Sequence, residues 1–114
     1  MTDDFFLQKK DEPEIIPLEE MFVAYCQMDP VSFEQNVELL PLSQSDKWLI
    51  SARILNMITL TTTDTGLAFF KFRKRALNYD EYLTYLEDLA TMRNLDLEDM
   101  KYKMQICGMP KKAS

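Results

Sequence analysis

The side chains that most often carry catalysis and metal binding are scarce in this chain of 114 residues. It contains no histidine, which excludes Ser-His-Asp and Cys-His arrangements and removes the commonest metal ligand. Two cysteines, Cys26 and Cys107, cannot form a structural zinc site without histidine, and we expect both to pack as small apolar residues. Two glycines are too few for a glycine-rich phosphate loop. We therefore expect no metal and no other cofactor.

Pairs of carboxylates are the remaining candidates for acid–base chemistry. They occur at Asp80-Glu81, Glu87-Asp88 and Glu98-Asp99, at predicted helix starts or on polar helix faces. The helix dipole explains carboxylates in a first turn, and solvation explains those on a polar face. The sequence therefore predicts a protein that acts by binding and not by catalysis, and a small enzyme is the weakest alternative.

A compact basic segment is the strongest candidate for a contact. Lys71, Arg73, Lys74 and Arg75 place four positive charges within five residues of a chain whose net charge is −6. Such a segment is suited to docking on an acidic protein surface. The alternative is a solvated loop whose charges only offset neighbouring carboxylates. The negative net charge disfavours a general nucleic-acid binder.

Aromatic residues are dense on both sides of this basic segment. Core packing accounts for four of them, Phe69, Phe72, Tyr79 and Tyr82. We expect Tyr85, and one of the two adjacent phenylalanines 69 and 70, to lie off the core face. An exposed aromatic residue is a candidate contact, so Tyr85 joins the basic segment as a candidate binding residue.

The elements that must position these residues are mostly helices. The spacing of apolar residues predicts helices over 18–28, 43–57, 64–72, 79–92 and 97–107. Asn78 and Asp96 are the expected N-caps of the last two. Apolar residues cover so much of the circumference of 43–57 that we expect this helix, with Trp48 in the core, to be buried on two sides. Residues 31–42 are expected to form a loop with one or two helical turns.

Two short extended segments, predicted at 58–61 and 77–79, complete the order of elements. The predicted order is helix, loop, helix, extended segment, helix, loop, extended segment and helix, which we interpret as the order of a paired EF-hand. The predicted fold class is all-α: a degenerate paired EF-hand-like domain over 18–110 with two very short extended segments. A flexible acidic arm, 1–17, precedes it, and a tail, 111–114, follows it. The arm carries three adjacent apolar residues, Phe5 to Leu7, as candidates for docking.

Calcium binding is not expected from this EF-hand-like order. If Leu77 holds the central apolar position eight of the second loop, Phe70, Phe72 and Lys74 hold the ligand positions one, three and five. None of these side chains binds calcium, and the lysine repels it. The first loop lacks alternating oxygen ligands.

We expect neither a signal peptide nor a membrane-spanning segment from this sequence. Its acidic start has no apolar core of signal-peptide length, and no apolar run approaches the roughly 20 residues that cross a bilayer. Two cysteines also fall short of a disulfide framework. We expect a cytoplasmic protein that does not bind membranes and is a monomer or self-associates weakly.

Several separated motifs resemble the tubulin polymerization-promoting protein family. Residues 61–72 resemble its T-x-T-D-x-x-(I/L)-x-F-x-K segment. Residues 77–90 resemble its extended apolar residue, its aromatic helix start and its L-E-x-L-A helix end. The helix with Phe22 and Tyr25 and the pair Lys47-Trp48 resemble upstream elements, so the resemblance covers about residues 18–90.

The resemblance implies an EF-hand-like fold without calcium and a non-catalytic protein that binds tubulin or microtubules. It implies promotion of microtubule assembly or bundling. Cytoplasmic microtubules and the axoneme of a cilium or sperm tail are both open as locations, and a short acidic domain without the basic bundling segment would suit a structural role on the axoneme. The loop at 72–76 is shorter than in family members, the basic C-terminal segment is missing, a further helix closes the chain, and the charge is negative. These departures weaken the expectation of bundling. The alternative is a calcium-independent EF-hand-like adaptor for another protein partner.

Overall fold

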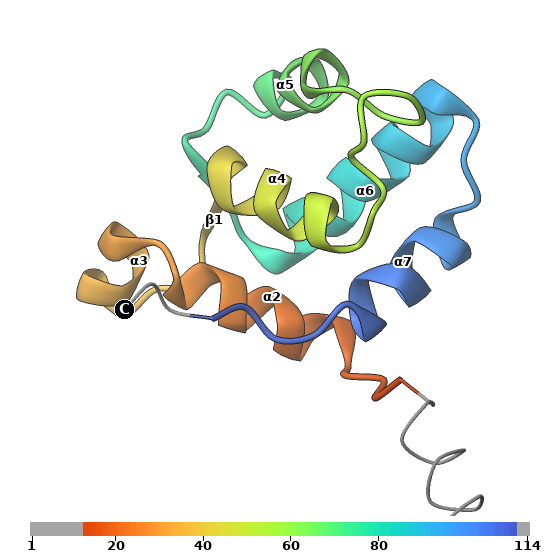
Figure 1. Cartoon of the computed structure of the whole chain (residues 1–114). Coiled ribbons are helices and arrows are strands. Elements are labelled where there is room, and N and C mark those ends of the chain that lie inside the picture. Colours follow the sequence, from red (N-terminus) through yellow and green to blue (C-terminus); the bar gives the residue numbers. More distant parts are fainter. Residues whose placement is uncertain (1–12, 112–114) are drawn as a thin grey trace, which may run out of the picture.

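The computed structural model describes residues 13–111 of the chain. Over that range it contains six helices and a two-stranded antiparallel sheet (Figure 1). The elements are α2 (Leu18–Gln27), α3 (Pro30–Gln35), β1 (Leu40–Pro41), α4 (Leu42–Ser51), α5 (Thr62–Phe70), β2 (Ala76–Leu77), α6 (Tyr79–Arg93) and α7 (Leu97–Ile106). Along 13–111, no helix has both the length and the apolar character that a bilayer span requires.

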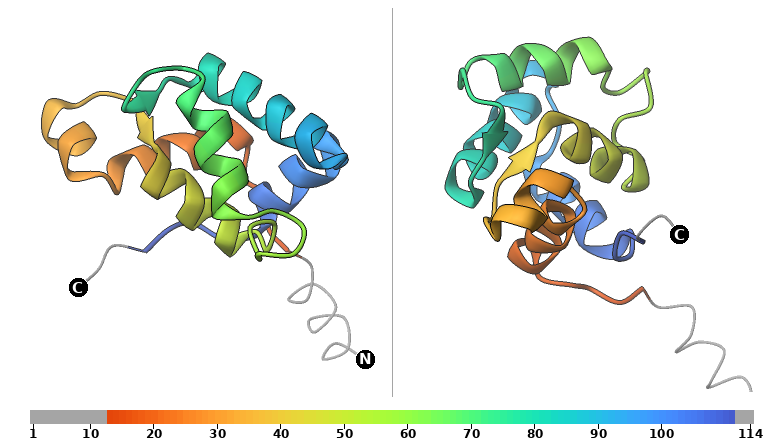
Figure 2. Two further views of the ribbon diagram at one scale, coloured as in Figure 1. Left: turned by 90° about the horizontal axis from the view of Figure 1, so that it is seen from above. Right: turned by 90° about the vertical axis from the view of Figure 1, so that its left-hand side faces the viewer.

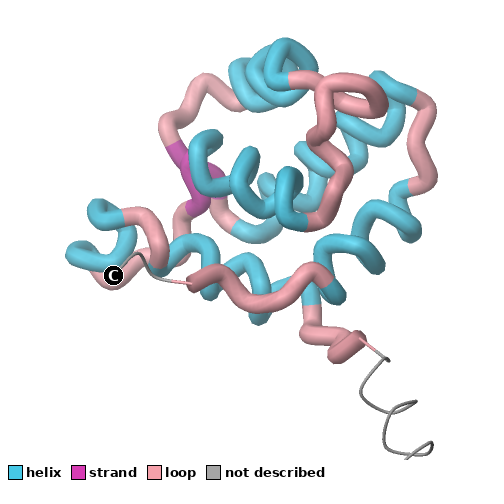
Figure 3. The backbone as a smooth tube through the Cα atoms, in the orientation of Figure 1, coloured by secondary structure: helices cyan, strands magenta, loops and turns pink. Residues whose placement is uncertain are grey.

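The small sheet joins two helix–strand–helix units, α2-β1-α4 and α5-β2-α6. Leu40 pairs with Leu77 and Pro41 with Ala76, and all four residues are buried. The two strands, magenta in Figure 3, lie side by side between the helices of the two units. This pairing of two loops through short strands confirms the predicted fold class, a mostly helical domain of the paired EF-hand type.

The first strand lies elsewhere than predicted. It is Leu40–Pro41, whereas the extended segment predicted at 58–61 is an irregular loop. There the Asn56 side-chain oxygen accepts hydrogen bonds from the backbone N–H groups of Ile58 and Thr59, at 2.9 and 2.7 Å. These local bonds occupy donors that a strand ladder would need. The second predicted segment is confirmed at Leu77, although its strand begins one residue earlier.

Helix α4 is shorter than the predicted helix over 43–57. It ends at Ser51, and Arg53 adopts a left-handed conformation with φ 62°. The backbone N–H of Ile54 then donates to the carbonyl of Leu49 at 2.9 Å, which closes the helix end. Glycine usually marks such an end, and arginine gives no such signal. Of the second apolar row of the predicted helix, Ile54 is buried, whereas Ile50 and Met57 are exposed. Helix α4 packs against α2, α5 and α7, as the prediction of burial on two sides requires.

The predicted N-caps of α6 and α7 are confirmed. The Asn78 side chain accepts a hydrogen bond from the Glu81 N–H at 2.8 Å, and the Glu81 carboxylate accepts one from the Asn78 N–H at 3.0 Å. At α7, the Asp96 carboxylate accepts from the N–H groups of Glu98 and Asp99. These bonds satisfy backbone donors that a helix start leaves unpaired. The caps therefore fix where both helices leave their loops.

Trp48 lies in the core, as predicted, and is fully buried. Its ring stacks on Tyr25, with centroids 5.2 Å apart, and on Tyr82, 5.6 Å apart. Its indole N–H donates to the Met104 carbonyl at 3.0 Å, which fixes α7 against α4. Cys26 is fully buried, and burial raises the pKa of its thiol to about 12, so it packs as the predicted apolar residue.

The packed part of the chain begins before α2. Ile16 is buried, and its backbone N–H donates to the carbonyl of Gln105 in α7 at 3.0 Å. Part of the segment predicted as a flexible arm is therefore held against the last helix. The apolar residues Phe5 to Leu7 and the tail residues 112–114 lie outside the described residues.

Candidate functional site

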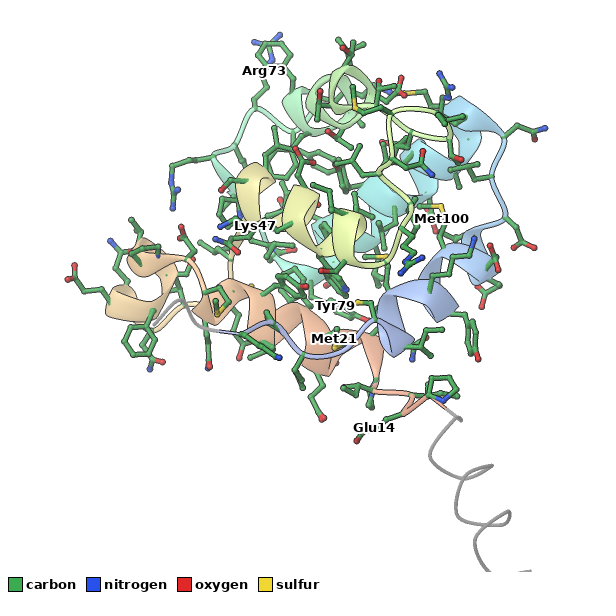
Figure 4. The ribbon with its side chains drawn as sticks, in the orientation of Figure 1. Glu14, Met21, Lys47, Arg73, Tyr79 and Met100 are labelled. Atoms are coloured by element: carbon green, nitrogen blue, oxygen red, sulfur yellow. The ribbon has the colours of Figure 1, made fainter. Side chains whose placement is uncertain are left out.

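The basic segment forms the turn between α5 and β2. Helix α5 packs against α4 and α6 and lies over them in the view from above (Figure 2). The segment leaves the end of this helix with Lys71, Arg73, Lys74 and Arg75 exposed. Arg73 has a φ of 55°, in the left-handed region, and its side chain extends away from the helices (Figure 4). The loop therefore presents its cations to solvent at one end of the molecule.

Two of the four cations are anchored to the body of the domain. Lys74 forms an ion pair with Glu81 of α6, and the Arg75 guanidinium lies 3.7 Å from the buried carboxylate of Asp29. The hydrogen bond from Lys74, with that from the Asn78 N–H, lowers the pKa of Glu81. Lys71 and Arg73 have no ion-pair partner within 13–111. The segment thus divides into an anchored half and a half available to a partner.

The available cations lie beside exposed apolar side chains of α5. Leu67 and Phe70 are 59% and 67% exposed, and with Lys71 they occupy positions i, i+3 and i+4 on one helix face. The Arg73 guanidinium lies 5.3 Å from the centroid of the Phe70 ring, a cation–π contact. We call Leu67, Phe70, Lys71 and Arg73 the α5 patch.

Tyr85 cannot belong to this surface. It is fully buried, with its ring 5.3 Å from that of Phe69 and 5.4 Å from that of Tyr82. Burial raises the pKa of its hydroxyl, which has no hydrogen-bond partner among the described residues. The prediction that Tyr85 is an exposed contact was wrong, because α6 packs against both α5 and α7 and buries a wider face than its spacing indicated. The exposed aromatic is Phe70, since of the two adjacent phenylalanines Phe69 is buried.

Both loops of the EF-hand-like pair have residues that exclude calcium. With Leu40 and Leu77 at position eight of their loops, Gln44 and Glu81 hold position twelve, where calcium needs a bidentate glutamate. Glu81 is the correct residue type, but the ammonium group of Lys74 binds it and takes the place of a cation. Gln44 carries a neutral amide. Within 13–111 there is no group of three or more His, Cys, Asp or Glu side chains placed to hold a metal ion.

Calcium is therefore expected to leave the protein unchanged. Adding millimolar Ca²⁺ should shift neither the thermal midpoint nor the tyrosine and tryptophan emission, because an ion that binds only the folded state would have to raise the midpoint. Thermal melts with Ca²⁺ and with a chelator provide the comparison. A midpoint several degrees higher with Ca²⁺ would show that one loop binds the ion after all.

Comparison with known proteins gives one family. The model of the p25-alpha family matches residues 19–114. No curated protein and no solved structure matches the chain. The match extends over α7, so the last helix is part of the family domain and not an addition to it. Because the match covers most of the chain, the chain belongs to the p25-alpha family, that of the tubulin polymerization-promoting proteins.

Proposed function

We propose that the protein binds tubulin or microtubules without catalysis, and that the α5 patch is the contact. The observation that carries this proposal is the position of two cations without ion-pair partners in 13–111, Lys71 and Arg73, beside the exposed side chains of Leu67 and Phe70. Membership of the p25-alpha family supports tubulin as the acidic partner. Bound in this way, the protein would promote or stabilise microtubule assembly.

The division of the basic segment explains how an acidic protein can bind an acidic surface. The net charge of −6 repels such a surface at long range, but exposed charges are screened over about 8 Å at physiological ionic strength. At contact, the local cations of the α5 patch dominate, and burial of Phe70 and Leu67 adds a component that salt does not weaken. The protein must therefore approach with the end of α5 foremost.

The matched test compares two pairs of cations. Lys71→Gln/Arg73→Gln should weaken co-sedimentation with microtubules about tenfold, because each lost surface ion pair contributes up to about 1 kcal/mol. Lys101→Gln/Lys103→Gln is the control, since it removes the same charge from α7, where both lysines pair only within the helix with Glu98 and Asp99. The control should bind nearly as well as the unmodified chain.

Two further measurements complete the experiment: the salt dependence of binding and the helical circular dichroism of each variant. Binding of the unmodified chain should fall as salt rises, and this dependence should become shallower in Lys71→Gln/Arg73→Gln. The helical circular dichroism should be the same in all variants, because neither pair contributes to the core. Equal losses in both variants would contradict a specific contact at α5. Absence of co-sedimentation at low salt would instead favour an adaptor for another partner. Imaging of the tagged protein in ciliated and spermatogenic cells separates cytoplasmic from axonemal microtubules.

A further inference from the structure

A pocket of about 510 Å³ opens between α2, α3 and α4 and is bordered by Pro110 and Lys111. Its apolar wall consists of Met28, Pro30 and Phe33. Its polar wall is one face of α4, because Gln44, Lys47 and Ser51 occur at positions i, i+3 and i+7 of that helix. Figure 4 shows Lys47 on the side of α4 nearest to α3. The pocket therefore combines an apolar wall with a polar one.

The charge of this pocket is the opposite of that of the chain. Lys47 and Lys111 line it, and no carboxylate does, although the whole protein carries −6. Neither lysine has an ion-pair partner in the described part of the chain. The nearby acid Asp29 is occupied by the N–H of Ser32 and by the guanidinium of Arg75. The electrostatic complement of the pocket is thus an anionic group that the described residues do not supply.

The pocket is also lined by a side-chain amide that makes no hydrogen bond within 13–111. Gln44 is only 7% exposed, yet its side chain makes no hydrogen bond with any residue in 13–111. Among the described residues, only Asp46 Oδ1 and the Tyr85 hydroxyl oxygen are fully buried without a partner, so the polar atoms of Gln44 are reached from the pocket and can bind a ligand group there. A carboxylate would accept a hydrogen bond from the amide nitrogen of Gln44 and would form an ion pair with Lys47.

We propose that this pocket binds an acidic segment of a partner protein. An apolar side chain of the segment packs against Met28, Pro30 and Phe33, and its carboxylates contact Lys47, Lys111 and the Gln44 amide. An acidic peptide with an apolar side chain can contact both walls, whereas a free inorganic anion would contact only the polar wall. This site is separate from the α5 patch, and its occupant can come from any partner with this chemistry.

The probe is a blocked peptide of four glutamates around a central phenylalanine, titrated into the full chain and followed by amide NMR shifts. Two variants of the peptide, one with glycine for phenylalanine and one with glutamines for the glutamates, test the two walls. The first peptide should shift the resonances of Met28, Gln44 and Lys47, and each altered peptide should bind about tenfold more weakly. Equal affinity for all three peptides, or shifts confined to α5, would overturn the proposal.

Variants of the protein locate the site. Lys47→Gln and Gln44→Leu should both weaken binding of the glutamate–phenylalanine peptide, whereas Lys71→Gln/Arg73→Gln should leave it unchanged. This last variant separates the pocket from the proposed tubulin contact, because each surface can fail alone. Lys47 is exposed, so its replacement should preserve the fold, and the amide spectrum checks this for Gln44→Leu. If deletion of residues 1–12 exposes the pocket and the peptide Met1–Glu12 then binds there more tightly, the occupant is the chain's own arm and the proposal of a partner segment fails.

Discussion

Replacing Trp48 with alanine should lower the free energy of unfolding by about 4 kcal/mol, close to the largest loss that one core substitution produces. Its indole is fully buried between the rings of Tyr25 and Tyr82 and also holds the carbonyl of Met104. Alanine leaves a large cavity between α2, α4 and α6 and removes the indole donor to that carbonyl, which then keeps only the weaker thiol donor of Cys107 among the described residues. Because domains of this size are stable by only about 5–15 kcal/mol, much of the protein would unfold in mild denaturant.

Two further variants separate cavity from hydrogen bond. Trp48→Phe keeps an aromatic ring in the stack and loses the indole N–H. We expect it to cost about 2 kcal/mol, part of it because the Met104 carbonyl then keeps only the weaker Cys107 thiol as a side-chain donor. Leu67→Ala, on the exposed face of α5, should change stability by less than about 0.5 kcal/mol. Urea unfolding followed by far-ultraviolet circular dichroism measures all three. A loss below about 1 kcal/mol in Trp48→Ala would contradict the central place of this ring.

The parts of the fold that the sequence predicts well are those with local signals. The 15-residue helix α6 has both a regular apolar face and a side chain that can cap it, and its predicted bounds differ from the observed ones only at the last residue. The strand β1 has no such signal, because two residues form a strand only when a distant partner, here β2, supplies the hydrogen bonds. The early end of α4 depends on a left-handed arginine, Arg53, which no propensity predicts.

The same distinction applies to the candidate sites. Charge density alone identifies the basic segment, but its division depends on Asp29 and Glu81, which only the folded chain brings to Arg75 and Lys74. Tyr85 was misplaced because its burial results from neighbouring helices and not from its own spacing. Gln44 has no sequence signal of its own. Only the pairing of Leu40 with Leu77 shows that Gln44 holds position twelve of the first loop.

The pairing of Leu40 with Leu77 leads to a second prediction with a large expected effect on stability. Leu40→Ala and Leu77→Ala should each lower the free energy of unfolding by about 3 kcal/mol, because both side chains are fully buried and each leaves a cavity. The two residues face each other across the sheet, so the second substitution enlarges a cavity that the first has already opened. The double variant should therefore lose less than the sum of the two, with an interaction energy of about 1 kcal/mol.

A control pair tests whether this coupling is specific to the sheet. Leu40 and Leu89 are both fully buried, but Leu89 is on α6, twelve residues beyond the paired Leu77, and has no partner in β1. The double variant Leu40→Ala/Leu89→Ala should lose the sum of its single effects to within about 0.5 kcal/mol. Additivity in Leu40→Ala/Leu77→Ala as well would show that the strands contribute little energy to joining the two units. The contacts of Trp48 across α2, α4 and α6 would then hold the units together.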